Sequence, residues 1–256
     1  FMFIIIAMTA LFAPQIATHD PAEISMAKAL QAPSAAHLCG TDEFGRDVFS
    51  RIVYGSRISL SISLSVLVAT GAAGTMLGLL AGYYGAADMI IMRIMDGLMA
   101  FPTVILALVL LTVLGPGIGN IVLALSLTQI PRVVRTVRAT AISARQYEHV
   151  EAARAMGASD FRIMFKYILP LCISPLIIRL TLIMALTVLN EASLTFLGAG
   201  LPPETPSWGS ILSEARQHAT TSPYLILLPG GAIVWSVMAL NILGDGLRDA
   251  LDPRLG

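Results

Sequence analysis

The stretch LSISLSVLVATGAAGTMLGLLAGY, residues 60–83, decides the fold class of this chain. Its first residues alternate serine with leucine or isoleucine, a period of two that is typical of a half-buried β-strand. The run then continues without a charge for the roughly 20 residues that a helix needs to cross a bilayer. A lone strand cannot satisfy its backbone hydrogen bonds in lipid, so we interpret the stretch as a membrane-spanning helix.

Three glycines in this stretch recur every four residues, at Gly74, Gly78 and Gly82. This spacing places them on one face of a helix, where the absence of a side chain lets two backbones approach closely. We therefore expect this face to pack against another helix.

The composition of the whole chain also indicates a membrane protein. Hydrophobic residues make up 56% and charged residues 12% of the sequence, whereas soluble domains carry about 25% charged residues. The net charge is zero, which gives no bulk attraction to nucleic acid. The two cysteines, Cys39 and Cys172, lie far apart and lack metal-ligand spacing, so we expect neither a disulfide nor a metal site from them.

Five further apolar runs complete the expected fold. The first run, residues 1–13, is too short to span a bilayer. We interpret it as a helix truncated at its N-terminus and not as the core of a signal peptide. The fourth span is expected to continue through Pro131 towards residue 137. We expect one all-α integral membrane domain, residues 1–256, built as a bundle of six transmembrane helices. The five runs are residues 1–13, 98–114, 121–130, 171–189 and 224–243.

The placement of Lys and Arg predicts the orientation of these spans. The connection 132–166 holds seven basic residues, whereas the connection 198–223 holds only Arg216. We therefore place 132–166 and the C-terminal tail in the cytoplasm, and the loops 14–57 and 198–223 outside. The four basic residues of the first outer loop are offset by five acids. Six spans then leave both termini in the cytoplasm.

The sequence of the connection 132–166 predicts a helical hairpin. Gly157 supplies the stop expected just past a helix, and Ser159 or Asp160 can cap a second short helix that runs to residue 169. Pro170 fits the start of the next span. Glu151 is expected on an exposed face of the first helix.

Four motifs in this order resemble a known family. EAARAMG at 151–157 with LP at 169–170 is similar to the EAA loop of ABC importer permeases, although the family's usual Ile before LP is Tyr167 here. The other three resemble the dipeptide/oligopeptide/nickel branch of that family. They are GTDEFGRD at 40–47, SWG at 207–209 and GDGLRDALDP at 244–253.

The resemblance implies a permease subunit that forms half of a pathway for di- or oligopeptides in a bacterial inner membrane, with a nickel or metal-chelate importer as the alternative. The EAA loop, about 139–170, would dock on a cytoplasmic ATPase. Glu151, Ala152, Ala153 and Gly157 would be the docking positions. The implied partners are a second homologous permease, two ATPases that bind ATP and Mg, and an extracytoplasmic substrate-binding protein.

The sequence independently indicates that this chain does not power itself. A Walker A loop needs a lysine directly after glycine, and neither Lys28 nor Lys166 follows one. An ion-coupled carrier, the less favoured alternative, would place ionisable groups inside its spans. Arg179 and Glu191 in the fifth span are the two pathway candidates. We expect no cofactor in this chain.

A membrane enzyme is a further alternative that the motifs do not favour, since neither H-E-x-x-H nor G-x-S-x-G occurs. His37 with Cys39 and Asp42 could be grouped as a metal site, but the polarity of the loop explains these residues more simply.

Arg46, Asp47 and Trp208, in the expected outer loops, could contact the binding protein. Bracing of the loops against each other is the favoured interpretation.

Overall fold

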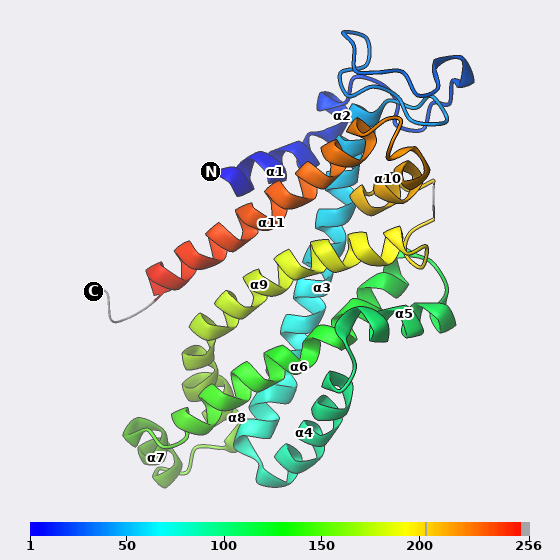
Figure 1. The fold of residues 1–256 in the computed structure, drawn as a ribbon. Coiled ribbons are helices and arrows are strands. Elements are labelled where there is room, and N and C mark those ends of the chain that lie inside the picture. Colours follow the sequence, from blue (N-terminus) through cyan, green and yellow to red (C-terminus); the bar gives the residue numbers. More distant parts are fainter. Residues whose placement is uncertain (203, 252–256) are drawn as a thin grey trace.

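The computed structural model of the chain describes residues 1–202 and 204–251, and within them it is helical, with one isolated β-bridge between Thr41 and Asp47 (Figure 1). The α-helices are α1 Met2–Leu11, α2 Ala13–Ile16, α3 Val48–Tyr83, α4 Gly85–Met99, α5 Thr103–Leu114, α6 Ile118–Ala144, α7 Glu148–Ala155, α8 Asp160–Arg162, α9 Leu169–Phe196, α10 Trp208–Ala215 and α11 Tyr224–Leu251. Three short elements join them: the 3₁₀ turns η1 Met26–Lys28 and η3 Arg216–His218, and the π-helix η2 Ile163–Ile168.

Helix α3 is the central element, and it confirms that the serine-alternating stretch is helical. Its serine hydroxyls are satisfied within the helix, because Ser61, Ser63 and Ser65 each donate to a backbone carbonyl three or four residues earlier. At 36 residues the helix is about 54 Å long, longer than the roughly 30 Å hydrocarbon core.

The start of α3 differs from the prediction. The helix begins at Val48 because the Asp47 carboxylate caps it by accepting the Ser50 N–H at 2.8 Å. The expected outer loop 14–57 is therefore wrong at its C-terminal end, where Arg51 and Arg57 are helical.

The three glycines of α3 pack against α6, as predicted. A Cβ placed on Gly74, Gly78 or Gly82 would lie 2.5–2.7 Å from side-chain atoms of Val133, Val137 and Ala141 respectively. No real Cβ approaches that closely, so the contact between α3 and α6 requires glycine at these positions.

Helix α6 continues through Pro131, as expected, but it extends to Ala144. Arg132, Arg135 and Arg138 therefore lie on a helix and not in a loop, which corrects the predicted connection 132–166. Two of them hold α6 to α4, since Arg135 pairs with Asp96 at 2.6 Å and Arg138 pairs with Asp88.

Among the residues that the structure describes, three helical stretches are long and apolar enough to cross a membrane: Val48–Tyr83, Asp160–Phe196 and Tyr224–Leu251. A fourth crossing arises if α4 and α5, which meet at 91°, form one broken span. The predicted third span, 98–114, is thus shorter than expected and follows a separate helix, α4.

The second helix of the predicted hairpin does not end at residue 169. It runs from α8 through η2 directly into α9, and the π-helical turn lies just before Pro170. Proline lacks an N–H and its ring collides with the carbonyl four residues earlier, and a wider turn relieves both problems.

The predicted outer loop 198–223 contains α10 and η3, and the C-terminal helix continues to Leu251. Asp252 and Pro253, where we expected the tail helix to end, lie outside the described residues. In Figure 1, α10 and the first loop lie at one end of α3, whereas α7 and α8 lie at the other.

Candidate coupling loop and membrane cavities

The turn after α7 has the geometry that a glycine-terminated helix predicts. Gly157 adopts φ +80°, a left-handed conformation that costs other L-residues roughly 1–2 kcal/mol. Its N–H bonds the Arg154 carbonyl at 3.0 Å, and the Ala158 N–H bonds the Ala153 carbonyl at 3.1 Å. These two bonds form a Schellman motif, which ends α7 and reverses the chain towards α8.

The four predicted docking positions divide into two groups. Glu151, Ala152 and Gly157 are exposed, whereas Ala153 is only 2% exposed and faces the rest of the chain. No atom lies within 4 Å of the position that a Gly157 side chain would take. The exposed three can meet a partner, while Ala153 instead contributes to packing beneath α7.

Three large apolar side chains on this hairpin escaped the sequence reasoning. Tyr147, Met156 and Phe161 are 46%, 80% and 67% exposed. Large apolar side chains exposed on a helical hairpin at the end of the bundle suit a protein interface. They could have been noticed in the sequence, because they are large apolar residues within its most charged stretch.

The hairpin is anchored firmly to the spans. Val150 and Ile163 are fully buried in one cluster with Val133 and Val137 of α6. Tyr83, at the end of α3, donates to Asp160 at 2.6 Å, and the Arg154 guanidinium lies 5.7 Å from the centroid of the Tyr83 ring. A force on α7 is therefore transmitted to α3 and α6.

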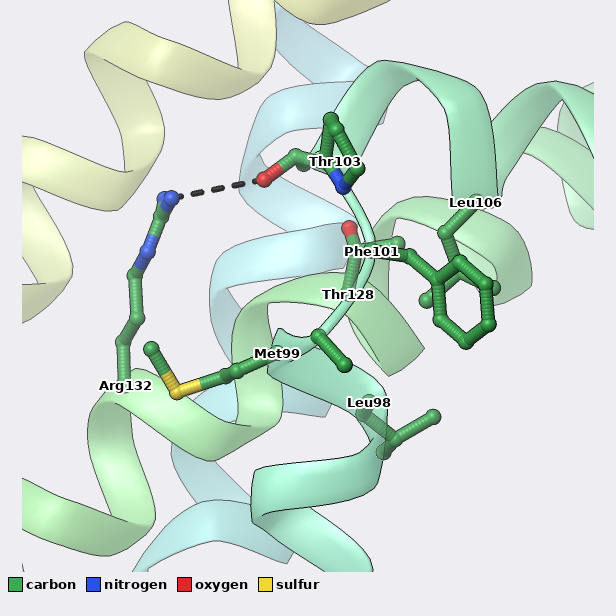
Figure 2. Close-up of a pocket in the computed structure, with 9 residues that line it drawn as sticks. Leu98, Met99, Phe101, Thr103, Leu106, Thr128 and Arg132 are labelled. Carbon is green, nitrogen blue, oxygen red and sulfur yellow. Dashed lines mark hydrogen bonds between the residues drawn. The ribbon is translucent and has the colours of Figure 1, made fainter.

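A cavity of about 370 Å³ opens at the break between α4 and α5 (Figure 2). The Arg132 guanidinium lies beside it and donates to the Thr103 hydroxyl at 3.3 Å and to Gln129 Oε1 at 2.6 Å. From the sequence we placed Arg132 in a loop and therefore did not predict that it lies beside a cavity. The arginine after Pro131, inside an apolar run, was the signal for it.

A second cavity, of about 270 Å³, is lined by Arg132, Arg179 and Asn241 together with apolar residues. Arg179 Nε donates to the Thr136 hydroxyl at 3.2 Å. The pathway candidate Arg179 is thus on a cavity, and Arg132 borders both cavities.

The other pathway candidate, Glu191, is fully buried. Its carboxylate accepts hydrogen bonds from Ser59 at 2.9 Å and from Thr195 and Ser207 at 3.1 Å. These donors come from α3, α9 and the residue that caps α10. In this conformation Glu191 joins helices at the end of the bundle where α10 lies (Figure 1).

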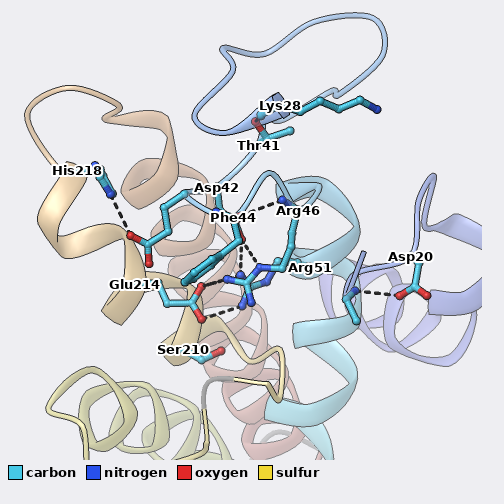
Figure 3. A network of polar contacts seen from close by, with 12 residues as sticks. Asp20, Lys28, Thr41, Asp42, Phe44, Arg46, Arg51, Ser210, Glu214 and His218 are labelled. Atoms are coloured by element: carbon cyan, nitrogen blue, oxygen red, sulfur yellow. Dashed lines mark hydrogen bonds and ion pairs between the residues drawn. The ribbon is translucent and has the colours of Figure 1, made fainter. Parts of the chain in front are cut away.

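Near the start of α3, Arg46 and Arg51 enter a largely buried ion-pair network with Asp42 and Glu214 (Figure 3). Trp208 is 2% exposed and donates its indole N–H to the Ile52 carbonyl at 3.0 Å. Arg46 and Trp208 therefore brace the loops internally. Their contact with a binding protein stays a prediction.

Asp47 is also buried, and it pairs with His37 at 2.9 Å. Burial alone would raise the pKa of this carboxyl, but hydrogen bonds from Ser50 and His37 hold it below its usual value. The grouping of His37 with Cys39 and Asp42 does not form, because Asp42 binds the arginines and Cys39 packs beside an apolar cluster.

Residues 74–256 match the family described as "Binding-protein-dependent transport system inner membrane component". The chain is 43% identical over 249 residues to the dipeptide transport system permease protein DppC of Alkalihalophilus pseudofirmus, covering 97% of this chain and 82% of that protein. It is 45% identical over 226 residues to the glutathione transport system permease protein GsiD of Pectobacterium atrosepticum, covering 88% and 75%. Its fold resembles a chain of the MetNI methionine ABC transporter in an inward-facing conformation, with a TM-score of 0.64, 18% identity, and coverage of 79% of this chain and 96% of that one.

Proposed function

This chain belongs to the family of binding-protein-dependent transport system inner membrane components, and we propose that it forms half of the pathway through which an ATP-driven importer brings peptides into a bacterial cell. As a member of that family it is a permease subunit of an ABC transporter and is not itself catalytic. ATP and Mg are bound by partner subunits.

The observation that carries the proposal is the glycine-terminated hairpin at one end of the bundle. Glu151 and Gly157 are exposed on it beside Tyr147, Met156 and Phe161. A mixed surface of this kind suits a groove on a cytoplasmic ATPase. Because the hairpin packs directly on α3 and α6, movement of the ATPase would tilt the spans next to the cavities.

The proposed assembly contains a second homologous permease, two ATPases and an extracytoplasmic binding protein. The chain crosses the inner membrane six times with both termini in the cytoplasm, so α7 faces the ATPases and the loop before α3 faces the binding protein. In this arrangement α1 belongs to the first span, α6 is a span, and α4 with α5 forms one broken span.

The proposed substrates are di- and oligopeptides. Relatives named for dipeptide and glutathione transport support this class, and so do the guanidinium groups of Arg132 and Arg179 beside the cavities. Charged groups inside a membrane are costly and mark transport pathways. Arginine is also well suited to the carboxylate that ends every free peptide.

The test is reconstitution of this chain with its partner subunits in proteoliposomes. We expect uptake of radiolabelled peptide that requires ATP and the loaded binding protein, and that an imposed proton gradient alone does not drive. Glu151→Lys should abolish uptake while the chain still inserts into the membrane, and Glu204→Gln, at an exposed residue far from the hairpin, should not. Uptake of nickel instead of peptide would contradict the proposed substrate class. Uptake without ATP would contradict the proposed ATP-driven mechanism.

A further inference from the structure

Three metal-binding side chains from separate segments meet where α3 begins. His19 follows α2, His37 lies in the loop before α3, and Asp47 caps α3. One nitrogen or oxygen atom from each lies within 4.8 Å of the other two. His37 and Asp47 are buried, and His19 is partly exposed. None of these residues takes part in the coupling hairpin or lines the membrane cavities.

The distances suit a small ion. Nδ1 of His37 lies 2.9 Å from Oδ1 of Asp47, and Nδ1 of His19 lies 3.8 Å from the same oxygen. Zinc binds nitrogen and oxygen at about 2.0–2.1 Å, and tetrahedral geometry then separates two ligand atoms by about 3.4 Å. These two separations lie on either side of this value, and all three donor atoms lie within 4.8 Å of one another, so rotations of the side chains would bring the donors onto one ion.

The surrounding contacts hold the carboxylate in place for such an ion. Asp47 Oδ2 accepts the Ser50 N–H at 2.8 Å and the Thr18 hydroxyl at 3.4 Å. These bonds leave Oδ1 facing the two imidazoles. Metal-binding side chains are commonly oriented by outer hydrogen bonds of this kind.

A hydrogen bond between His37 and Asp47 would by itself tie the loop to α3, but it does not account for His19. The His19 ring lies against that of His37, with 4.6 Å between the centroids. The small cavity beside the cluster is also lined by Asp20, Glu23 and Lys28. Two carboxylates and one ammonium group give this part of the surface an excess of negative charge, which attracts a cation.

We propose that His19, His37 and Asp47 bind one divalent transition-metal ion of the zinc class. Two imidazole nitrogens with one carboxylate oxygen suit Zn²⁺, whereas Mg²⁺ and Ca²⁺ prefer oxygen ligands alone. For His37 to bind the ion through Nδ1, its neutral ring would take the tautomer that carries the proton on Nε2, which leaves the Nδ1 lone pair free beside Asp47. The ion would fasten the segment after α2 and the loop before α3 to the start of α3.

The experiment measures Zn²⁺ binding by the assembled transporter. His19→Ala is the main variant, because His19 is partly exposed and its loss leaves the bond between His37 and Asp47 intact. His218→Ala is the matched control, since His218 is another outer-face histidine, paired with Glu43 at 3.1 Å outside the cluster. The complexes are equilibrated with Zn²⁺, exchanged into metal-free buffer and analysed by mass spectrometry, and affinity is measured by competition with a chromogenic chelator.

We expect the His19→Ala complex to retain one Zn²⁺ fewer per permease chain, or to bind that ion at least about tenfold more weakly. Zn²⁺ should raise the thermal unfolding midpoint of the wild type and of His218→Ala, but not that of His19→Ala. Equal zinc content and equal thermal shifts in wild type and His19→Ala would overturn the proposal. An equal loss in His218→Ala would overturn it as well.

Discussion

Tyr83 donates a hydrogen bond to Asp160 across 2.6 Å, which joins the last residue of α3 to the first residue of α8. The same hydroxyl lies 3.4 Å from Nη2 of Arg154 on α7. Tyr84 donates a second bond to Asp160 at 3.0 Å. The two halves of the coupling hairpin are therefore tied through one phenol to the helix that packs on α6.

Replacing Tyr83 with phenylalanine should loosen this tie without unfolding the bundle. The ring and its packing remain, whereas the hydrogen bonds that join the hydroxyl to two charged partners, Asp160 and Arg154, disappear. We expect fewer peptides to be transported per ATP hydrolysed in proteoliposomes. Tyr84→Phe is the control, since the Tyr84 hydroxyl bonds Asp160 but not Arg154 and the residue is more exposed. Equal coupling in wild type and Tyr83→Phe would refute this role.

Gly157→Val should uncouple ATP hydrolysis from transport. A β-branched residue is strongly disfavoured at φ +80°, so the Schellman turn would open and α7 would lose its position. Gly157→Asn is the informative partner variant, because asparagine tolerates the left-handed region best among residues with side chains. We expect transport to be lost in the first and largely retained in the second. Similar losses in both would indicate that side-chain bulk at the interface, and not backbone conformation, is what matters.

Gly78→Ala should destabilise the bundle, because the new Cβ would lie 2.7 Å from the Val137 Cβ and 3.0 Å from the Val134 carbonyl oxygen. Overpacking of this kind costs about 1–3 kcal/mol. The matched control is Gly97→Ala on α4, where nothing lies within 4 Å and alanine's higher helix propensity favours folding by about 1 kcal/mol. Thermal unfolding in detergent should therefore move in opposite directions for the two variants.

The features that could be predicted from the sequence are those set by neighbours along the chain. The uncharged run 60–83, the period of Gly74 to Gly82 and the stop at Gly157 all express local backbone and helix geometry. Features set by distant contacts were missed. The place of Arg132 next to an apolar run marks it as unusual, but only its contacts with other helices show that it borders two cavities. The buried setting of Glu191 likewise depends on Ser59 and Ser207, which lie on other elements.

Glu214→Gln should strongly destabilise the outer face. Glu214 accepts hydrogen bonds from Arg51 at 2.6 Å and from Arg46 at 2.6 Å (Figure 3). Removing one partner of a buried pair leaves an uncompensated charge, which costs about 3–5 kcal/mol. We expect a lower unfolding midpoint and faster proteolysis of the loop before α3. The exposed Glu204→Gln is the control, and an unchanged midpoint for Glu214→Gln would show that Asp42 alone neutralises the two arginines.

Arg132→Ala should impair peptide movement while leaving the docking of the ATPase intact. Arg132 borders both cavities and is held by Gln129 and Thr103, so its guanidinium is fixed where a peptide carboxylate would pass. We expect at least about a tenfold loss of transport at saturating loaded binding protein, equivalent to about 1.4 kcal/mol, with basal ATP hydrolysis unchanged.

Arg132→Lys should recover part of the activity, because lysine keeps the charge but loses the fork that binds both neighbours. Arg135→Ala is the matched control, because Arg135 lies on the same helix as Arg132 and its change removes only an exposed pair with Asp96 of α4. If it reduced transport as much as Arg132→Ala, general loss of positive charge on α6 would explain both, and the assignment of Arg132 to the pathway would fail.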